Sequence, residues 1–253
     1  MKTTKRIISL ILTFAIVVLA FTSCALTPQA AMKKADKALI GASYKLSTKV
    51  EVSSNNEFVN GVFAGMNNEI DTYVDGNNFS FDFNVSGVKM SADCVDNTAY
   101  FDISAYGQSQ KFTAKLDSDD REELFETSTA GMEISDFDYG KADATKEDGK
   151  YIITFDEIDA EDLNDIVDDL VGNLGMNEMS IKSVSLKIVI ADGKYESIAL
   201  DMATAVHQIA GEDMQIKMNI VLNYDYEDTK KITKPEDISE YTEVDIDDIP
   251  LFS

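Results

Sequence analysis

The chain has 253 residues, of which 44% are apolar, so it can fold around a sizeable core and is not a disordered chain. Its formal net charge is −24. Without residues 1–23, which hold three of the 22 basic residues and no acidic residue, the charge becomes −27. A surface this acidic repels nucleic-acid phosphates and anionic lipid headgroups. We therefore expect no nucleic-acid partner, and a domain that does not lie flat on a membrane through charge attraction.

The first twenty-one residues have the pattern of an export signal. Lys2, Lys5 and Arg6 precede a nearly unbroken apolar run over 7–21. This run of about 15 residues is shorter than the roughly 20 that a membrane-spanning helix needs. A basic start followed by a short apolar segment is typical of a signal peptide.

The next residues, Phe21-Thr22-Ser23-Cys24, resemble the bacterial lipobox, in which small residues precede a cysteine that is acylated. Phe21 stands where that motif prefers leucine. The resemblance implies a signal peptide over 1–23, an acylated anchor and short tether over 24–27, and a protein held on the extracytoplasmic face of the cell membrane. Two alternatives remain open, which are ordinary secretion with cleavage near Ala25 or Ala30, and an uncleaved anchor.

Cysteine usage agrees with acylation. The second cysteine is Cys94, which has no partner for a disulfide bond once Cys24 carries lipid. Alternation places Cys94 on one face with Met90 and Ala92, so we expect a buried core residue.

Three amphipathic helices are expected, over 28–41, 118–125 and 160–174. Thr27 and Pro28 suit the start of the first, and Gly41 suits its end. The acidic residues that follow Ser118 suit the start of the second. The third carries an apolar stripe from Leu163 to Leu174.

Most of the remaining chain alternates apolar and polar residues with a period of two, which predicts half-buried strands joined by tight turns. The first such strand begins at Tyr44. Further strands are expected over 57–66, 68–75, 78–86, 88–95, 98–105, 109–116, 133–140, 149–157, 184–190, 198–206 and 214–226. The last three include strands longer than the usual five or six residues, so they predict a long curved sheet. The residues from Ile232 onward are expected to be acidic and loosely held.

This order of elements resembles the LolA-like superfamily of exported lipid and lipoprotein carriers, and the ending over 232–241 resembles that of uncharacterised Gram-positive lipoproteins. The resemblance implies an α+β, mostly antiparallel fold, in which a half-barrel that does not close carries helices on its concave face. It implies one domain over 28–245, followed by an acidic tail over 246–253. It also implies an apolar cavity that accepts acyl chains, for which the candidate cavity residues are Leu200, Met202, Met218, Ile220 and Leu222.

No catalytic site is expected. His207 is the single histidine and falls on the polar parity of its strand, so a triad or a histidine-rich metal site cannot be built. Ser86-Gly87-Val88-Lys89 matches S-x-x-K by chance, because it falls between strands and lacks its companion motifs. The acids Asp245, Asp247 and Asp248 do not form a calcium loop. We expect no metal and no cofactor.

The sequence therefore predicts a non-enzymatic lipoprotein on the outer face of the cell membrane that carries or senses an apolar ligand such as a lipid. The alternative is a structural or interaction module of the cell envelope with a filled core. A hydrolase is a third alternative. A ligand-sized apolar cavity would separate the first two.

Overall fold

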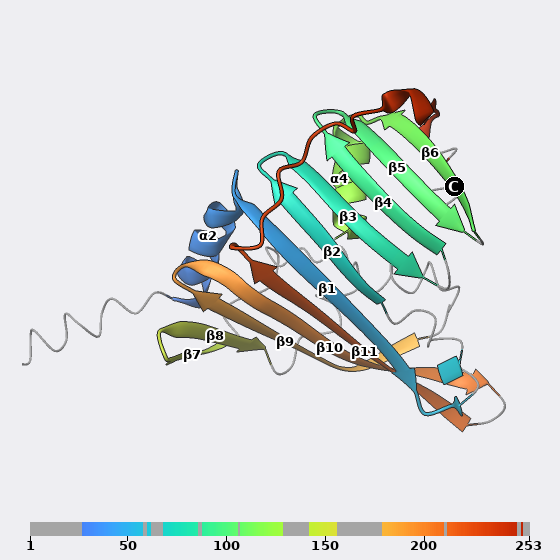
Figure 1. The fold of residues 1–253 in the computed structure, drawn as a ribbon. Helices are drawn as coiled ribbons and strands as arrows, with labels where there is room; N and C mark the ends of the chain where they lie inside the picture. The colour runs from blue at the N-terminus through green and yellow to red at the C-terminus, as the bar shows by residue number, and fades with distance from the viewer. Residues whose placement is uncertain are drawn as a thin grey trace, which may run out of the picture.

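The computed structural model describes residues 27–57, 60–61, 68–85, 88–105, 107–128, 142–155, 179–209, 212–246 and 249. Its centre is one twelve-stranded sheet, which is antiparallel except where β12 pairs with β6 (Figure 1). The end strands, β12 and β7, do not pair with each other, so the sheet is unclosed. The strand order is β12 (Thr242–Glu243), β6 (Gln108–Lys115), β5 (Thr98–Ala105), β4 (Val88–Val95), β3 (Asn78–Val85), β2 (Asn68–Asp75), β1 (Ser43–Ser54), β11 (Glu212–Asp225), β10 (Lys194–Ile209), β9 (Met179–Ala191), β8 (Lys150–Phe155) and β7 (Asp143–Glu147).

The first helix, α2 (Pro28–Leu39), confirms the prediction over 28–41 to within two residues. The Thr27 side chain accepts a hydrogen bond from the backbone N–H of Ala30 at 3.3 Å, which satisfies one of the unpaired donors at the helix start. Gly41 has φ +70°, a left-handed conformation that glycine adopts without strain. Sequence alone thus fixed both ends of this helix.

Two meanders meet at β1. Strands β1 to β6 follow one another in the sheet, as do β7 to β11, and β1 pairs with β11 along ten residue positions. Three of the tight turns use Gly76, Asp96 and Gly193, all with positive φ. The predicted strands over 68–75, 88–95 and 98–105 are confirmed with the same bounds.

The predicted strand over 57–66 is wrong where the structure describes it, because residues 57, 60 and 61 are helical. The Asn60 side chain accepts a hydrogen bond from the backbone N–H of Ser54 at 2.6 Å. The strand β1 ends at Ser54, and the described residues that follow it do not continue the strand. The strand β7 was not predicted, since its side chains are all exposed and show no alternation. The expected strand over 133–140 and the expected helix over 160–174 lie outside the described residues.

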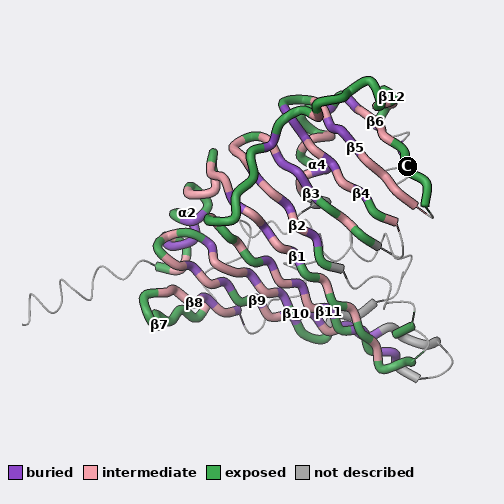
Figure 2. The backbone as a smooth tube through the Cα atoms, viewed as in Figure 1, coloured by how far each residue is buried: buried purple, intermediate pink, exposed green. Residues whose placement is uncertain are grey.

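One face of the sheet carries a continuous apolar core that runs from β6 to β8 (Figure 2). The second helix, α4 (Ser118–Ser128), confirms the prediction at 118–125 and adds Leu124 to this core. Helix α2 adds Ala31, Met32 and Ala35 to the same core. Both described helices therefore pack on the apolar face of the sheet. In the view of Figure 1, α4 lies behind β3 and β4.

The expectation of a loosely held C-terminal segment is wrong for the described part of that segment. Ile232 is buried with Val95 and Tyr100 in a small second cluster. The chain then passes the 3-10 helix η3 (Ile238–Glu240), pairs through β12 with the edge strand β6, and returns Ile246 and Ile249 to the main core. The segment thus crosses from one face of the sheet to the other and covers the edge of β6, where exposed backbone groups would otherwise invite aggregation.

Candidate functional site

The five candidate cavity residues lie together on β10 and β11. Met202 pairs directly with Met218, and Leu200 pairs with Ile220. All five are buried, with exposed fractions between 2% and 8%, and all belong to the main core. Strand parity predicted that they share a face. What parity did not predict is their neighbours on the two flanking strands, which are Val50 and Val52 of β1 and Val184 and Leu186 of β9.

Thr48 on β1 is the residue at this site that sequence reasoning had not singled out. It is fully buried and pairs with Leu222 on one side and Ile70 on the other. Its Oγ1 has no hydrogen-bond partner. An unpaired hydroxyl inside an apolar surface lowers the free energy of unfolding by about 1–3 kcal/mol. Thr48 therefore destabilises a core that serves packing alone. The sequence does show one sign of it, because Thr48 is a polar residue on the strand face that also carries Leu46 and Val50.

A valine at position 48 tests this cost. We expect Thr48→Val to raise the free energy of unfolding of the ligand-free protein by about 1 kcal/mol, because valine keeps the shape of threonine and removes the unpaired hydroxyl. The matched control is Thr204→Val, which removes a hydroxyl that donates to the Ile216 carbonyl at 3.5 Å and so should not stabilise. Urea unfolding of both variants measures the difference. A loss of stability in Thr48→Val would show that the hydroxyl is satisfied in solution.

A tyrosine cluster fixes α2 to the sheet. Tyr224 stacks at 5.8 Å from Tyr44 and at 5.6 Å from Tyr195, measured between ring centroids. The Tyr195 hydroxyl donates a hydrogen bond to Asp36 of α2 at 2.5 Å. Burial, with a smaller contribution from nearby Tyr226, raises the pKa of Tyr44 to about 12. Burial also raises the pKa of Tyr224, so Tyr44 and Tyr224 are neutral at physiological pH and contribute to packing.

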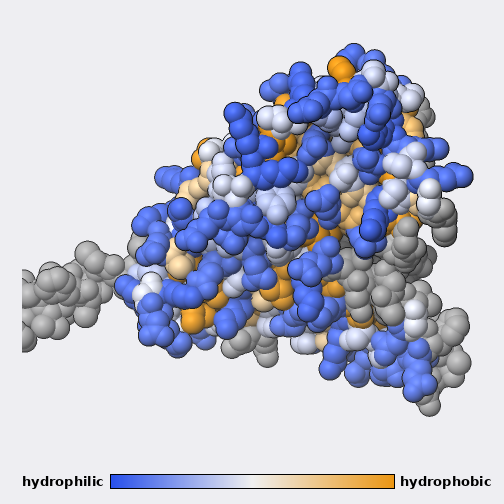
Figure 3. All heavy atoms as spheres, in the orientation of Figure 1, coloured by the Kyte–Doolittle hydropathy of each residue, from blue (hydrophilic) through white to orange (hydrophobic). Residues whose placement is uncertain are grey.

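The opposite face of the sheet is polar, and Figure 3 shows it covered mostly by hydrophilic side chains. An open hollow of about 570 Å³ lies over β2 to β5 and is bordered by Glu69, Asp71, Asp82 and Asp102. Asp71 and Asp82 are direct cross-strand partners. Among the described residues, no group of three or more carboxylate, histidine or cysteine side chains is placed to hold a metal ion.

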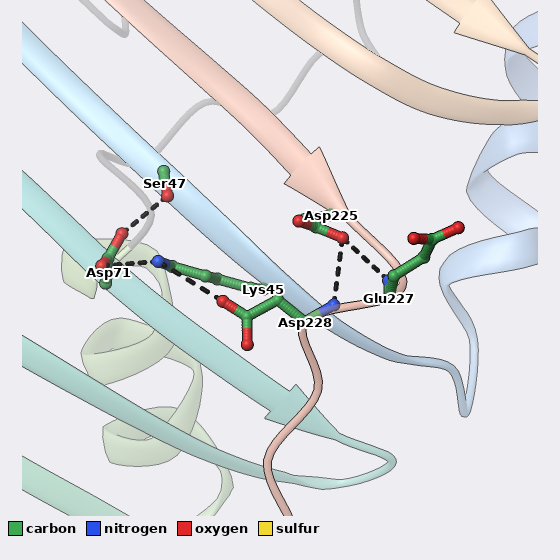
Figure 4. Close-up of polar contacts among 6 residues, drawn as sticks. All are labelled: Lys45, Ser47, Asp71, Asp225, Glu227 and Asp228. Atoms are coloured by element: carbon green, nitrogen blue, oxygen red, sulfur yellow. Dashed lines mark hydrogen bonds and ion pairs between the residues drawn. The ribbon is translucent and has the colours of Figure 1, made fainter.

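Lys45 offsets part of this acidity (Figure 4). Its Nζ lies 2.7 Å from Asp71, which also accepts a hydrogen bond from the Ser47 hydroxyl at 2.6 Å, and 3.7 Å from Asp228. The hydrogen bond to Asp71 raises the pKa of Lys45. Asp225 accepts backbone hydrogen bonds from Glu227 and Asp228, which lower its pKa. The network holds the chain as it leaves β11, so we assign it a structural role.

Cys94 is fully buried beside Met90 and Ala92, as the alternation predicted. Burial raises the pKa of its thiol to about 12. We therefore expect the folded Cys24→Ala protein to resist iodoacetamide at pH 8 and to react fully once unfolded in guanidinium, since the thiolate is the reacting species. Because an unfolded thiol ionises near its ordinary pKa, Cys94 should also favour unfolding as the pH rises from about 9 to 12. Mass spectrometry of the alkylated protein measures the first effect, and full reaction of the folded protein would contradict it.

The remaining sequence candidates stay as predictions. Cys24 lies outside the described residues, as do Ser86 and Gly87, whereas Val88 and Lys89 of the S-x-x-K segment are the first two residues of β4. The backbone of His207 belongs to β10, but its side chain is outside the described set. Among the described helices, neither α2 nor α4 is long and apolar enough to cross a membrane.

Compared with known proteins, the chain matches no family model, no curated protein and no solved structure. The resemblance to the LolA-like carriers is therefore still a prediction.

Proposed function

We propose that this protein is a non-enzymatic, lipid-anchored protein of the extracytoplasmic membrane face, and that its sheet binds an apolar ligand such as an acyl chain. In this proposal the sheet is a half-barrel, its concave side is the apolar face, and α2 and α4 pack on that side. The ligand lies along the Met202–Met218 pair. Cys24 is acylated and tethers the domain, and no metal or cofactor takes part.

The observation that carries the proposal is the apolar face itself. It extends without a break over strands from both meanders, on a sheet that does not close. Two flexible thioethers face each other at its middle, and such side chains adapt to variable apolar ligands. The unpaired Thr48 hydroxyl lies two strands from Met202 on the same face. In this proposal the hydroxyl forms one hydrogen bond with a polar group of the ligand, and that bond offsets the free-energy cost of burying the hydroxyl.

The second candidate is an interaction module with a filled core, and burial favours it. Even Met218, the most exposed of the candidate cavity residues, is only 8% exposed. Open hollows lie on the polar face and beside α2. A further open hollow of about 410 Å³ is bordered by Met202 and Met218, but most of its lining residues are polar-face or small ones such as Ser185, Asp201 and Asn219. To bind a ligand along the candidate cavity residues, a carrier must therefore displace side chains that pack against one another. An interaction module requires no such displacement.

Native mass spectrometry with lipid extraction distinguishes the two. The protein is purified without detergent from its own host as the secreted Cys24→Ala form. The carrier proposal expects a stoichiometric lipid that is lost in Met218→Gln and kept in Lys217→Gln, an exposed neighbour on the other face of β11. A clean ligand-free mass, with no uptake of added fatty acids or glycolipids, would leave the interaction module as the better description.

A further inference from the structure

The exposed side of α2 is basic, in a chain that is otherwise strongly acidic. Lys33, Lys34 and Lys37 are all exposed and fall within about 100° of helix circumference. The buried side of the helix, with Ala31 and Ala35, lies opposite to them. We call the three lysines the α2 basic face.

The one acid of this helix is directed elsewhere. Asp36 accepts the hydrogen bond from the buried Tyr195 of β10, at the flank of the helix. Within the described part of the chain, no ion pair joins Lys33, Lys34 or Lys37 to a carboxylate. The α2 basic face therefore presents three lysines that form no ion pair among the described residues, and with the charge of Asp36 included the helix carries a net charge of +2.

The position of this face relative to the proposed anchor is constrained by chain length. Four residue steps separate Cys24 from Pro28, the first residue of α2. A fully extended chain covers about 14 Å in four steps. The tether can therefore hold the start of α2 within about two Debye lengths of a bilayer surface at physiological salt, where charges on the protein and on lipid headgroups still interact.

The helix is also rigidly attached to the sheet, so an orientation imposed on α2 is imposed on the whole domain. It packs against β9 and β10, its core residues are fully buried, and the Lys34 side chain lies against Gly193 in the turn between those strands. An alanine at 193 would place its Cβ 2.5 Å from Lys34 Cε. Lys34 therefore lies beside the β9–β10 turn, and Lys33 and Lys37 are held on the same helix.

We propose that the α2 basic face contacts the anionic lipid surface in which the protein is anchored, and that this contact makes the domain stand on its α2 end. Attraction acts on three lysines beside the tether, while the acidic remainder of the domain is repelled by the same surface. Opposite forces at the two ends of one rigid body set an orientation. The inference rests on the proposed anchor at Cys24, but not on the proposed ligand.

Lysine footprinting on the lipidated full-length mature protein tests the contact. The protein is reconstituted in vesicles of phosphatidylcholine alone, or with added phosphatidylglycerol, and labelled with an amine-reactive reagent before peptide mass spectrometry. We expect labelling of Lys33, Lys34 and Lys37 to fall about threefold or more in the anionic vesicles and to recover at about 0.5 M salt. Lys182 and Lys217, exposed near the other end of β9 and β11, serve as controls and should not change.

Two labelling results would contradict the proposed contact. Equal labelling of the three lysines in both vesicles overturns the proposed contact, and so does equal protection of Lys182 and Lys217, since the domain would then lie flat. A variant with Lys33→Gln, Lys34→Gln and Lys37→Gln should still float with both kinds of vesicle. The hydrogen-exchange rate of its α2 backbone should be the same in both, whereas in the unaltered protein anionic vesicles should slow that exchange. If the unaltered protein does not float with phosphatidylcholine vesicles, or its N-terminal peptide carries no lipid, the anchor itself is refuted and the inference fails with it.

Discussion

Replacing Cys24 with alanine is expected to move the protein from the membrane fraction to the soluble fraction, with the bound amount falling from nearly all to background. Two acyl chains give stable anchoring, so a protein that cannot be acylated at position 24 should lose its attachment. Fractionation of the host cells, together with metabolic labelling by a fatty acid, measures both the location and the lipid.

Cys94→Ala is the matched control for this experiment. Its thiol is buried and its pKa is raised, so it is a poor acceptor for lipid, and the variant should remain labelled and membrane-bound. A Cys24→Ala protein that stays on the membrane through a high-salt wash would favour the uncleaved anchor. An unaltered protein that carries no lipid and begins near Ala25 or Ala30 would favour ordinary secretion. Either result would overturn the anchored lipoprotein.

The second large effect is expected in the C-terminal segment. Ile249 is 1% exposed and belongs to the main core, together with residues that lie far from it along the chain. We expect Ile249→Ala to lower the free energy of unfolding by about 2–5 kcal/mol, because it removes buried methyl groups and leaves a cavity. Since whole domains are stable by only about 5–15 kcal/mol, this is a large share of the total.

Ile238→Ala is the control from the same segment. Ile238 is 58% exposed, so its truncation should change stability by no more than about 0.5 kcal/mol. Guanidinium unfolding of both variants gives the comparison. Equal, small effects would mean that the segment does not contribute to the core in solution, and that the sequence-based expectation of a loose tail was right after all.

The strands and the first helix could be predicted because their signals are local. Alternation along 88–95 and 98–105 places every second side chain on one face, and the structure keeps those bounds. The burial of Cys94 followed from the same alternation. Local signals failed at residues 57, 60 and 61, which are helical, and there the Asn60 side chain accepts a hydrogen bond from the Ser54 N–H.

The candidate site could be predicted only in part. Parity predicted that Met202 and Met218 lie on the apolar faces of their strands, and the structure pairs the two residues directly. Parity could not show that β1 lies beside β11, because that pairing joins segments about 170 residues apart and leaves no local mark. For the same reason Thr48 read as an ordinary strand residue, although the fold buries its hydroxyl without a partner.

The sequence by itself determined the acidic charge, the ends of α2 and the face to which most strand residues point. These depend on composition, on capping groups and on backbone periodicity, all of which act over a few residues. Only the tertiary structure decided that β1 joins the two meanders, that Asp36 is taken up by Tyr195, and that the acidic tail carries Ile232, Ile246 and Ile249 into packed positions. Burial depends on which distant surfaces meet, and a hydrophilic segment with three well-placed isoleucines shows no periodicity that would reveal it.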